Sequence, residues 1–281
     1  MINNVDLHIH SNASDGSMSP AETALAAYSA GLCAAALTDH DTVAGVAEFA
    51  EKCLKLGIEP ISGVEISAKF RCEMHILGLF VDVKNKNFLD KLSKLENARY
   101  DRNKAMLERF REMGMDITEA DIVSQKPNAT LENTGRSHMA TALVSKGYVS
   151  DRNEAFEKYL IKGKPAYVPR ITYSPAESIQ IIKEAGGIAV LAHPIYITSD
   201  ECQLRDLLTE LKSFGLDGVE SIYSDYTDDY SRLCLELCDE LGLMPTGGSD
   251  FHGENRPSVK LGDLNVPYEF LERLKKTAHK N

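Results

Sequence analysis

Short apolar runs rich in β-branched residues alternate with amphipathic stretches of helical period along most of the chain. The apolar runs predict strands at 5–9, 34–38, 59–66, 74–81, 188–192, 218–222 and 243–247. The amphipathic stretches predict helices at 19–30, 42–56, 174–185, 201–214, 227–241 and 268–279. Strands that alternate with helices in this way are typical of a parallel α/β sheet or barrel.

The third and fourth predicted strands break this rule. Nine residues separate Glu65 from His75, and a crossover between parallel strands needs about a dozen or more. We therefore expect these two strands to pair as an antiparallel hairpin. The end of one strand and the start of the next then lie at the same rim, so that Glu65 and His75 can meet there.

From 85 to 164 the alternation stops, and the sequence is helical at 88–114, 117–125, 137–147 and 151–160. A long interruption between two strands predicts an inserted helical subdomain. We expect a barrel domain made of residues 1–84 and 165–281. The insertion, 85–164, is expected to cover the barrel face that carries the active site.

The composition favours a small substrate over a polymer. The net charge is −11, and Lys and Arg are scattered rather than gathered in a basic stripe, which argues against extended nucleic-acid binding. No apolar run reaches the roughly 18 residues of a membrane span, and the first strand starts too close to Met1 for a signal peptide. We expect a cytoplasmic protein without membrane contact, as a monomer or small homo-oligomer.

The six cysteines form no CxxC pair and no disulfide framework, so reduced thiols are expected. Cys234 and Cys238 lie four residues apart, which places them on one face of a helix. We interpret them as small core side chains rather than as metal ligands.

Six of the eight histidines stand at the ends of predicted strands, beside carboxylates. They are His8 and His10 in DLHIH, His40 in TDHD, His75 in EMHILG, His193 in AHP and His252 in SDFH. Each motif alone is weak, because a single strand-end histidine is usually just hydrogen-bonded. Together with Asp15, Glu65 and Asp250 at the rim where barrel enzymes carry their active sites, they predict a metal centre.

The type of ligand limits the choice of metal. Nitrogen and oxygen ligands without cysteine suit manganese, iron or zinc, and disfavour a structural zinc site. The number of ligands indicates a catalytic site. Adjacent ions can generate a hydroxide near neutral pH and hold phosphoryl oxygens, so we expect a hydroxide between two metals to attack phosphorus in line.

The motifs HIHSNASDG, LTDHDT, GVEIS, HILG, LAHP and GGSDFH also carry a family resemblance. In them, and over essentially the whole chain, the sequence resembles the PHP (polymerase and histidinol phosphatase) phosphoesterases. The resemblance implies a distorted (β/α)7 barrel with a metal site of two or three ions. GRSHMA and GKPAYV in and near the insertion resemble the small-molecule subgroup that acts on nucleotides and related phosphates.

The resemblance further implies three metal positions. The first is ligated by His8, His10, Glu65 and Asp250, the second by Glu65, His75 and His193, and the third by Asp15, His40 and His252. Catalysis is assigned to Glu65, His193 and Asp250, with no residue identified as the general acid. Asp39 either orients the neighbouring histidine or is an acid at the start of the helix that follows.

A phosphate ester also needs cationic contacts that are not metal ions. Arg136, His138, Lys164 and Arg170 are the candidates, because Arg in particular binds phosphate through two parallel hydrogen bonds. Exposed salt-bridge residues would give the same pattern. Tyr223 and Tyr226 follow the sixth predicted strand and are candidates for stacking on a base or sugar.

Replacing Arg136 tests this assignment. If Arg136 binds the phosphate, the substitution should raise KM or lower kcat/KM for phosphate esters, measured by steady-state kinetics. An unchanged KM together with an unchanged kcat/KM would remove Arg136 from the substrate site.

The main hypothesis is a hydrolase that removes phosphate from a small ester, in first place a nucleotide such as a 3′,5′-bisphosphate or a mononucleotide. A cyclic phosphodiesterase acting on a phosphorylated ribose is the first alternative, followed by a histidinol phosphatase. A noncatalytic metal-binding module remains as an alternative of another class. A carbon–nitrogen hydrolase is less favoured, because such enzymes commonly use a metal-bridging lysine and no lysine ends a predicted strand.

Overall fold

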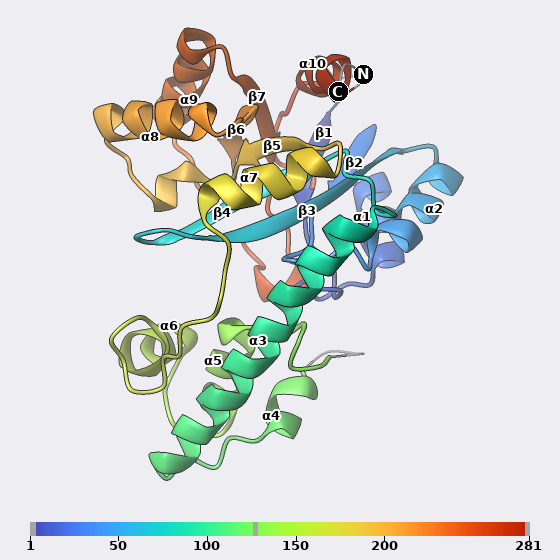
Figure 1. Cartoon of the computed structure of the whole chain (residues 1–281). Coiled ribbons are helices and arrows are strands. Elements are labelled where there is room, and N and C mark those ends of the chain that lie inside the picture. The colour runs from blue at the N-terminus through green and yellow to red at the C-terminus, as the bar shows by residue number, and fades with distance from the viewer. Residues whose placement is uncertain (1–3, 126–128, 279–281) are drawn as a thin grey trace. The chain divides into compact units, whose positions relative to one another are not determined.

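The computed structural model describes residues 4–125 and 129–278 (Figure 1). The chain forms two compact units: unit 1 is Met1–Lys91 with Tyr173–Asn281, and unit 2 is Leu92–Thr172. The boundaries fall a few residues beyond the expected ones, because helix α3 (Lys86–Glu112) begins within unit 1. There the Lys91 ammonium lies 2.6 Å from the Glu184 carboxylate.

The described part of unit 1 holds a seven-stranded sheet in the order β1-β2-β3-β4-β5-β6-β7. Its strands are β1 (Val5–Ile9), β2 (Ala34–Leu37), β3 (Glu59–Lys69), β4 (Glu73–Leu79), β5 (Ile188–Leu191), β6 (Gly218–Tyr223) and β7 (Met244–Gly248). Strands β1 to β3 and β5 to β7 pair in parallel. Only β4 runs the other way among them, antiparallel to both neighbours, so the expected hairpin is confirmed.

Strand β3 is longer than predicted. It continues past Ile66 to Lys69, because the hairpin register extends to the pair Lys69 and Glu73. A lysine therefore does end a strand, contrary to the expectation used against a carbon–nitrogen hydrolase. The Lys69 side chain is exposed, whereas Glu65 on the same strand is fully buried.

The first and last strands meet, so the sheet nearly closes into a barrel (Figure 1). The amide of Asp250 donates to the His8 carbonyl at 2.8 Å, and the amide of His10 donates to the Phe251 carbonyl at 2.9 Å. Gly248 ends β7 against this seam. A Cβ atom built there would lie 2.4 Å from the Cβ of His8 and 2.5 Å from its backbone nitrogen.

Gly248→Ala is expected to destabilise unit 1, because the backbone of β1 has to move to admit a methyl group. Overpacking of this kind costs about 1–3 kcal/mol, and more where the obstacle is backbone. Urea denaturation followed by circular dichroism measures the change. Ala substituted at Gly135, where the backbone φ is −130° and the added Cβ would meet only Arg99 Nη1, at 3.9 Å, is the comparison; equal stability of the two variants would contradict the close approach.

Helices surround the sheet of unit 1. They are α1 (Pro20–Ser29), α2 (Val46–Leu56), α7 (Pro175–Glu184), α8 (Glu201–Ser213), α9 (Asp228–Leu241) and α10 (Tyr268–Ala278). Ser19 caps α1 with a capping box that includes Glu22, and Pro20 stands at the first helical position. The predicted end of the last helix at His279 lies outside the described residues.

Helix α2 begins four residues later than predicted, at Val46 rather than at 42. The backbone of Asp41 has a φ of 58°, in the left-handed region that a right-handed helix cannot use. Residues 42–45 are not helical, and Thr42 Oγ1 accepts a hydrogen bond from the Ala44 amide. The late start keeps the residues after β2 free of the helix and available to the rim.

Unit 2 is helical and has its own core. The described elements are the rest of α3, then α4 (Glu119–Val123), α5 (Arg136–Ser145), α6 (Arg152–Ala155) and a π-helical turn (Phe156–Leu160). Buried side chains such as Met106, Phe110, Ile122, Leu143 and Leu160 pack together between them. Among the described residues of both units, no helix combines the length and the apolar character needed to cross a bilayer.

Candidate metal centre

All nine residues expected as metal ligands belong to unit 1, on or just after the strands that form its rim. They are His8 on β1, His10 and Asp15 after it, His40 after β2, Glu65 on β3, His75 on β4, His193 after β5, and Asp250 and His252 after β7. His8 and His10 point to one side, because side chains two residues apart on a strand share a face. Their Nε2 atoms lie 3.1 Å apart.

Glu65 is the centre of this cluster, and its carboxylate is fully buried. Five histidines surround its two oxygens: His75 at 2.9 Å and His193 at 3.0 Å from Oε1, and His40 at 2.9 Å, His10 at 3.2 Å and His8 at 3.4 Å from Oε2. The two oxygens therefore face two different sets of imidazoles. This division is the geometry that a carboxylate bridging two cations requires.

Two further carboxylates complete the cluster. Asp250 Oδ1 lies 3.2 Å from His10 Nε2 and 3.5 Å from His8 Nε2, and Asp15 Oδ1 lies 3.1 Å from His252 Nε2. Three groups of ligand atoms converge closely enough to hold an ion: His8, His10, Glu65 and Asp250; His10, Asp15, His40 and His252; and His40, Glu65 and His75. The first group equals the first implied position, and the second adds His10 to the third implied position.

His193 is not part of the group formed by His40, Glu65 and His75. Its Nε2 lies 3.0 Å from Glu65 Oε1 and 3.3 Å from His75 Nδ1, so it reaches the position implied for it. His40 Nδ1 lies 2.9 Å from the other oxygen of Glu65, Oε2, and His40 also forms a group with Glu65 and His75. His40 therefore lies between two of the groups rather than in one alone.

The electrostatics of the cluster prepare it for cations. Burial raises the pKa of Glu65, but the charges of His40 and His75 outweigh this effect and hold the pKa well below its usual range. Burial also lowers the pKa of His10, yet the neighbouring carboxylates of Asp250 and Glu65 raise it to about 10. The carboxylates are thus anionic, and His8 and His10, whose pKa values are raised, would each have to lose a proton to bind a cation.

The donor atoms of the cluster fit metal ions better than they fit one another. His40 Nδ1 and Glu65 Oε2 approach to 2.9 Å, but within the described residues neither atom, nor His10 Nδ1, has a hydrogen bond of acceptable geometry. Buried polar atoms in native proteins are nearly always satisfied. Imidazole nitrogens and carboxylate oxygens without a thiolate suit manganese, iron or zinc.

Glu220 is a residue of this centre that sequence reasoning missed. It is fully buried on β6, its Oε1 lies 2.9 Å from His8 Nδ1, and its Oε2 accepts the His193 amide at 2.8 Å. A proton on His8 Nδ1 leaves the Nε2 lone pair directed at the cluster. An acid in the middle of a buried apolar strand, GVESIY, is the signal that could have identified it.

Asp39 does not take either of the roles expected for it. Helix α2 starts too late for Asp39 to be an acid of its first turn, and its carboxylate accepts hydrogen bonds from the Ser11 amide at 2.8 Å, Ser11 Oγ at 2.7 Å and Ser14 Oγ at 2.6 Å. Asp39 thus fixes the loop that leads from His10 to Asp15. It acts on the position of Asp15 rather than on the ring of His40.

The two tyrosines considered for stacking are engaged elsewhere. Tyr223 is the last residue of β6 and is buried, with its hydroxyl donating to Asp250 Oδ2 at 2.8 Å. The Tyr226 hydroxyl donates to the Glu220 carbonyl at 3.1 Å. Tyr196 is an exposed aromatic residue near the cluster, and its ring lies 5.2 Å from that of His193.

Three side chains in or next to the centre rest on strained backbone. Asp41, His193 and Asp250 have φ angles of 58°, 27° and 56°, which residues other than glycine rarely adopt. Such conformations persist only where the surrounding structure holds them, and they concentrate at functional sites. Asp41 is held by the Ser67 amide, which donates to its carboxylate at 2.9 Å.

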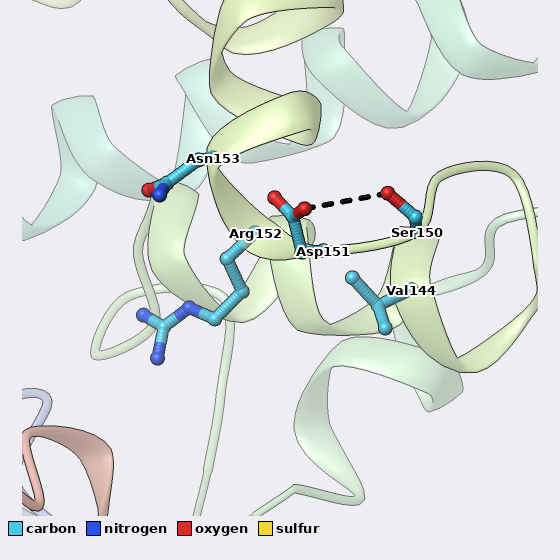
Figure 2. Close-up of a pocket in the computed structure, with 5 residues that line it drawn as sticks. All are labelled: Val144, Ser150, Asp151, Arg152 and Asn153. Carbon is cyan, nitrogen blue, oxygen red and sulfur yellow. Dashed lines mark hydrogen bonds between the residues drawn. The ribbon is translucent and has the colours of Figure 1, made fainter.

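The residues expected to bind phosphate belong to unit 2. Arg136 opens α5, and the ring Nδ1 of the buried His138 accepts a hydrogen bond from the Gly135 amide at 3.1 Å. Lys164 is exposed and Arg170 is half-buried. A hollow of about 420 Å³ in unit 2 is lined by none of these four, but by Val144, Ser150, Asp151, Arg152 and Asn153 (Figure 2).

Comparison with known proteins agrees with this geometry. Residues 6–183 match the family model of the PHP domain. The chain belongs to the PHP family. Its sheet of seven strands is the distorted (β/α)7 barrel of the PHP phosphoesterases, and the protein is a metal-dependent phosphoester hydrolase.

Relatives in the PHP family differ in what they act on. A 5′-3′ exoribonuclease of Haemophilus influenzae is 37% identical, over 90% of this chain and 91% of its own. A 3′,5′-nucleoside bisphosphate phosphatase of Chromobacterium violaceum is 34% identical, over 92% and 90%. A phosphoribosyl 1,2-cyclic phosphate 1,2-diphosphodiesterase of Eggerthella lenta is 32% identical, over 89% and 94%.

A solved structure also matches nearly the whole chain. The crystal structure of a putative metal-dependent phosphoesterase from Bifidobacterium adolescentis superimposes with a TM-score of 0.85 and 30% identity, covering 96% of this chain and 94% of that one. The match extends over both units. The insertion is therefore part of the shared architecture and not an addition peculiar to this chain.

Proposed function

We propose that this PHP protein is a phosphatase of small nucleotides, acting in first place on a nucleoside 3′,5′-bisphosphate. The observation that carries the proposal is the pair of imidazole sets around the two oxygens of Glu65, which is suited to adjacent divalent ions. The similarity to the Chromobacterium violaceum bisphosphate phosphatase supports the substrate class.

The chain's own residues supply binding and orientation. His8, His10, Glu65 and Asp250 form one ligand group, and Glu65 extends it towards His75 and His193. Divalent ions bound there would lower the pKa of water and neutralise charge on a phosphoryl group. Glu220 keeps His8 in one tautomer, and the buried position of Glu65 keeps bulk water from its carboxylate.

Two relatives favour other substrates for the same chemistry. The Haemophilus influenzae relative is named an exoribonuclease and the Eggerthella lenta relative a cyclic phosphate diphosphodiesterase. The net charge of −11 disfavours extended contact with a polynucleotide. A cyclic phosphate needs two hydrolytic steps, the first of which opens a ring without releasing phosphate.

Product analysis on a substrate panel separates these candidates. Manganese-loaded protein is given adenosine 3′,5′-bisphosphate, mononucleotides, a ribose cyclic phosphate, a 5′-phosphorylated RNA oligomer and histidinol phosphate. The proposal expects metal-dependent phosphate release, fastest from the bisphosphate. Stepwise shortening of the oligomer, or ring opening of the cyclic phosphate, at a higher kcat/KM would replace the proposed substrate with that class.

A further inference from the structure

The carboxylate of Asp250 is divided between two environments. Its Oδ1 faces the imidazoles, at 3.2 Å from His10 Nε2 and 3.4 Å from His252 Nδ1. Its Oδ2 accepts two hydrogen bonds on the opposite side, from the Tyr223 hydroxyl at 2.8 Å and from Arg256 Nη1 at 2.6 Å. Oδ1 is therefore the oxygen that can ligate a cation.

Arg256 is held so that its guanidinium cannot leave Asp250 easily. Nη1 also donates to the Tyr223 hydroxyl at 3.0 Å, and Nη2 donates to Asp225 Oδ2 at 2.7 Å. The Arg256 Cζ lies 5.4 Å from the centre of the Tyr223 ring. The Arg256 side chain is only 20% exposed, whereas that of Asp225 is 48% exposed, so Arg256 spans from the surface to the ligand.

Charge-assisted hydrogen bonds of this kind are short and strong, and the planar fork of Arg fixes direction as well as charge. Asp250 needs such a hold, because its backbone φ of 56° is unfavourable for a residue with a side chain. If Oδ2 were released, the carboxylate could rotate and present both oxygens, or neither, to the cluster.

We propose that Arg256 is a positioning residue that fixes Asp250 as a metal ligand through Oδ1 alone. The inference rests on the metal centre of the proposed function, but not on the identity of the substrate. Tyr223 shares this task through its hydroxyl, and Asp225 anchors the guanidinium from the surface side. Arg256 is not a metal ligand itself, since its guanidinium stays protonated and offers no lone pair.

The test is a metal titration of the full-length chain carrying Arg256→Gln, after treatment with a chelator. Loss of a residue that hydrogen-bonds to a metal ligand weakens metal affinity by about 10–100-fold. We expect the affinity for Mn²⁺ to fall by this factor, and electron paramagnetic resonance of the free ion measures it. The visible spectrum of bound Co²⁺ should also change, because it reports ligand geometry. Arg256→Lys, which keeps the charge but not the fork, should lie between Arg256→Gln and the wild type.

Arg232→Gln is the matched control, because this arginine lies on α9 and is exposed; its Mn²⁺ affinity should equal that of the wild type. Wild-type affinity and an unchanged Co²⁺ spectrum in Arg256→Gln would overturn the inference. The inference would also be overturned if Arg256→Gln were less stable than the wild type in chelator but bound Mn²⁺ with wild-type affinity, since Arg256 would then stabilise only the fold. Failure of the wild type to bind Mn²⁺ would instead overturn the metal centre.

Discussion

Glu65→Gln is expected to reduce phosphoesterase turnover by about 10³-fold or more while the chain stays folded. The substitution keeps the size of the side chain but removes the charge that five imidazoles surround. An amide cannot bridge two cations as a carboxylate does. A loss of about 4 kcal/mol of transition-state stabilisation, ordinary for metal catalysis, corresponds to this factor.

The assay for Glu65→Gln is phosphate release with saturating Mn²⁺, on whichever substrate of the panel is best. Metal analysis of the same sample should show less than the wild-type content of bound ions. Glu51→Gln, on the exposed face of α2, serves as the comparison and should be fully active. Wild-type turnover in Glu65→Gln would show that this cluster is not where the ester is cleaved.

Removal of metal ions with a chelator is expected to stop turnover and to lower the melting temperature of the protein. Ions that bind the folded chain alone stabilise it by about 2.7 kcal/mol for each site at a hundredfold excess over Kd. For a chain of this size that free energy amounts to several degrees in Tm. Thermal unfolding measured with chelator, and then with added Mn²⁺, gives both changes on one sample.

Binding of Mn²⁺ to the chelator-treated protein should also release protons. The reason is that the pKa of His10 is raised to about 10, and the pKa of His8 is also raised well above its usual value. Both rings are protonated at neutral pH, and a ligating imidazole must be neutral. Metal affinity should therefore increase as the pH rises and fall as the pH is lowered.

If neither turnover nor Tm changes when the chelator is added, metal ions have no role in catalysis or in stability.

The meeting of the candidate ligands at one rim could be predicted because it depends on strand direction and not on side-chain detail. Histidines that follow parallel strands meet at one rim wherever the helices lie. The short connection between Glu65 and His75 permits only a hairpin, and the observed register pairs His75 with Ser67, two residues along β3 from Glu65 and on the same face of the sheet. These are constraints of chain length and geometry, which a sequence states directly.

The residues that hold the ligands could not be predicted in the same way. Arg256 reaches Asp250 from a loop, and Glu220 reaches His8 from a strand 212 residues away in the chain. Each is a single polar residue without a spacing rule, and its partner depends on how the loops fold. The start of α2 was misplaced for a related reason, since the left-handed backbone at Asp41 leaves no mark in an amphipathic pattern.

The left-handed backbone at His193 and Asp250 has a consequence for the evolution of this fold. A residue with a side chain in such a conformation costs of the order of 1–3 kcal/mol, and glycine adopts it freely. A lineage that no longer needs the chemistry would gain stability by exchanging these residues for glycine. Glycine at either position, more than any loss of overall similarity, would mark a descendant that has kept the barrel and abandoned catalysis.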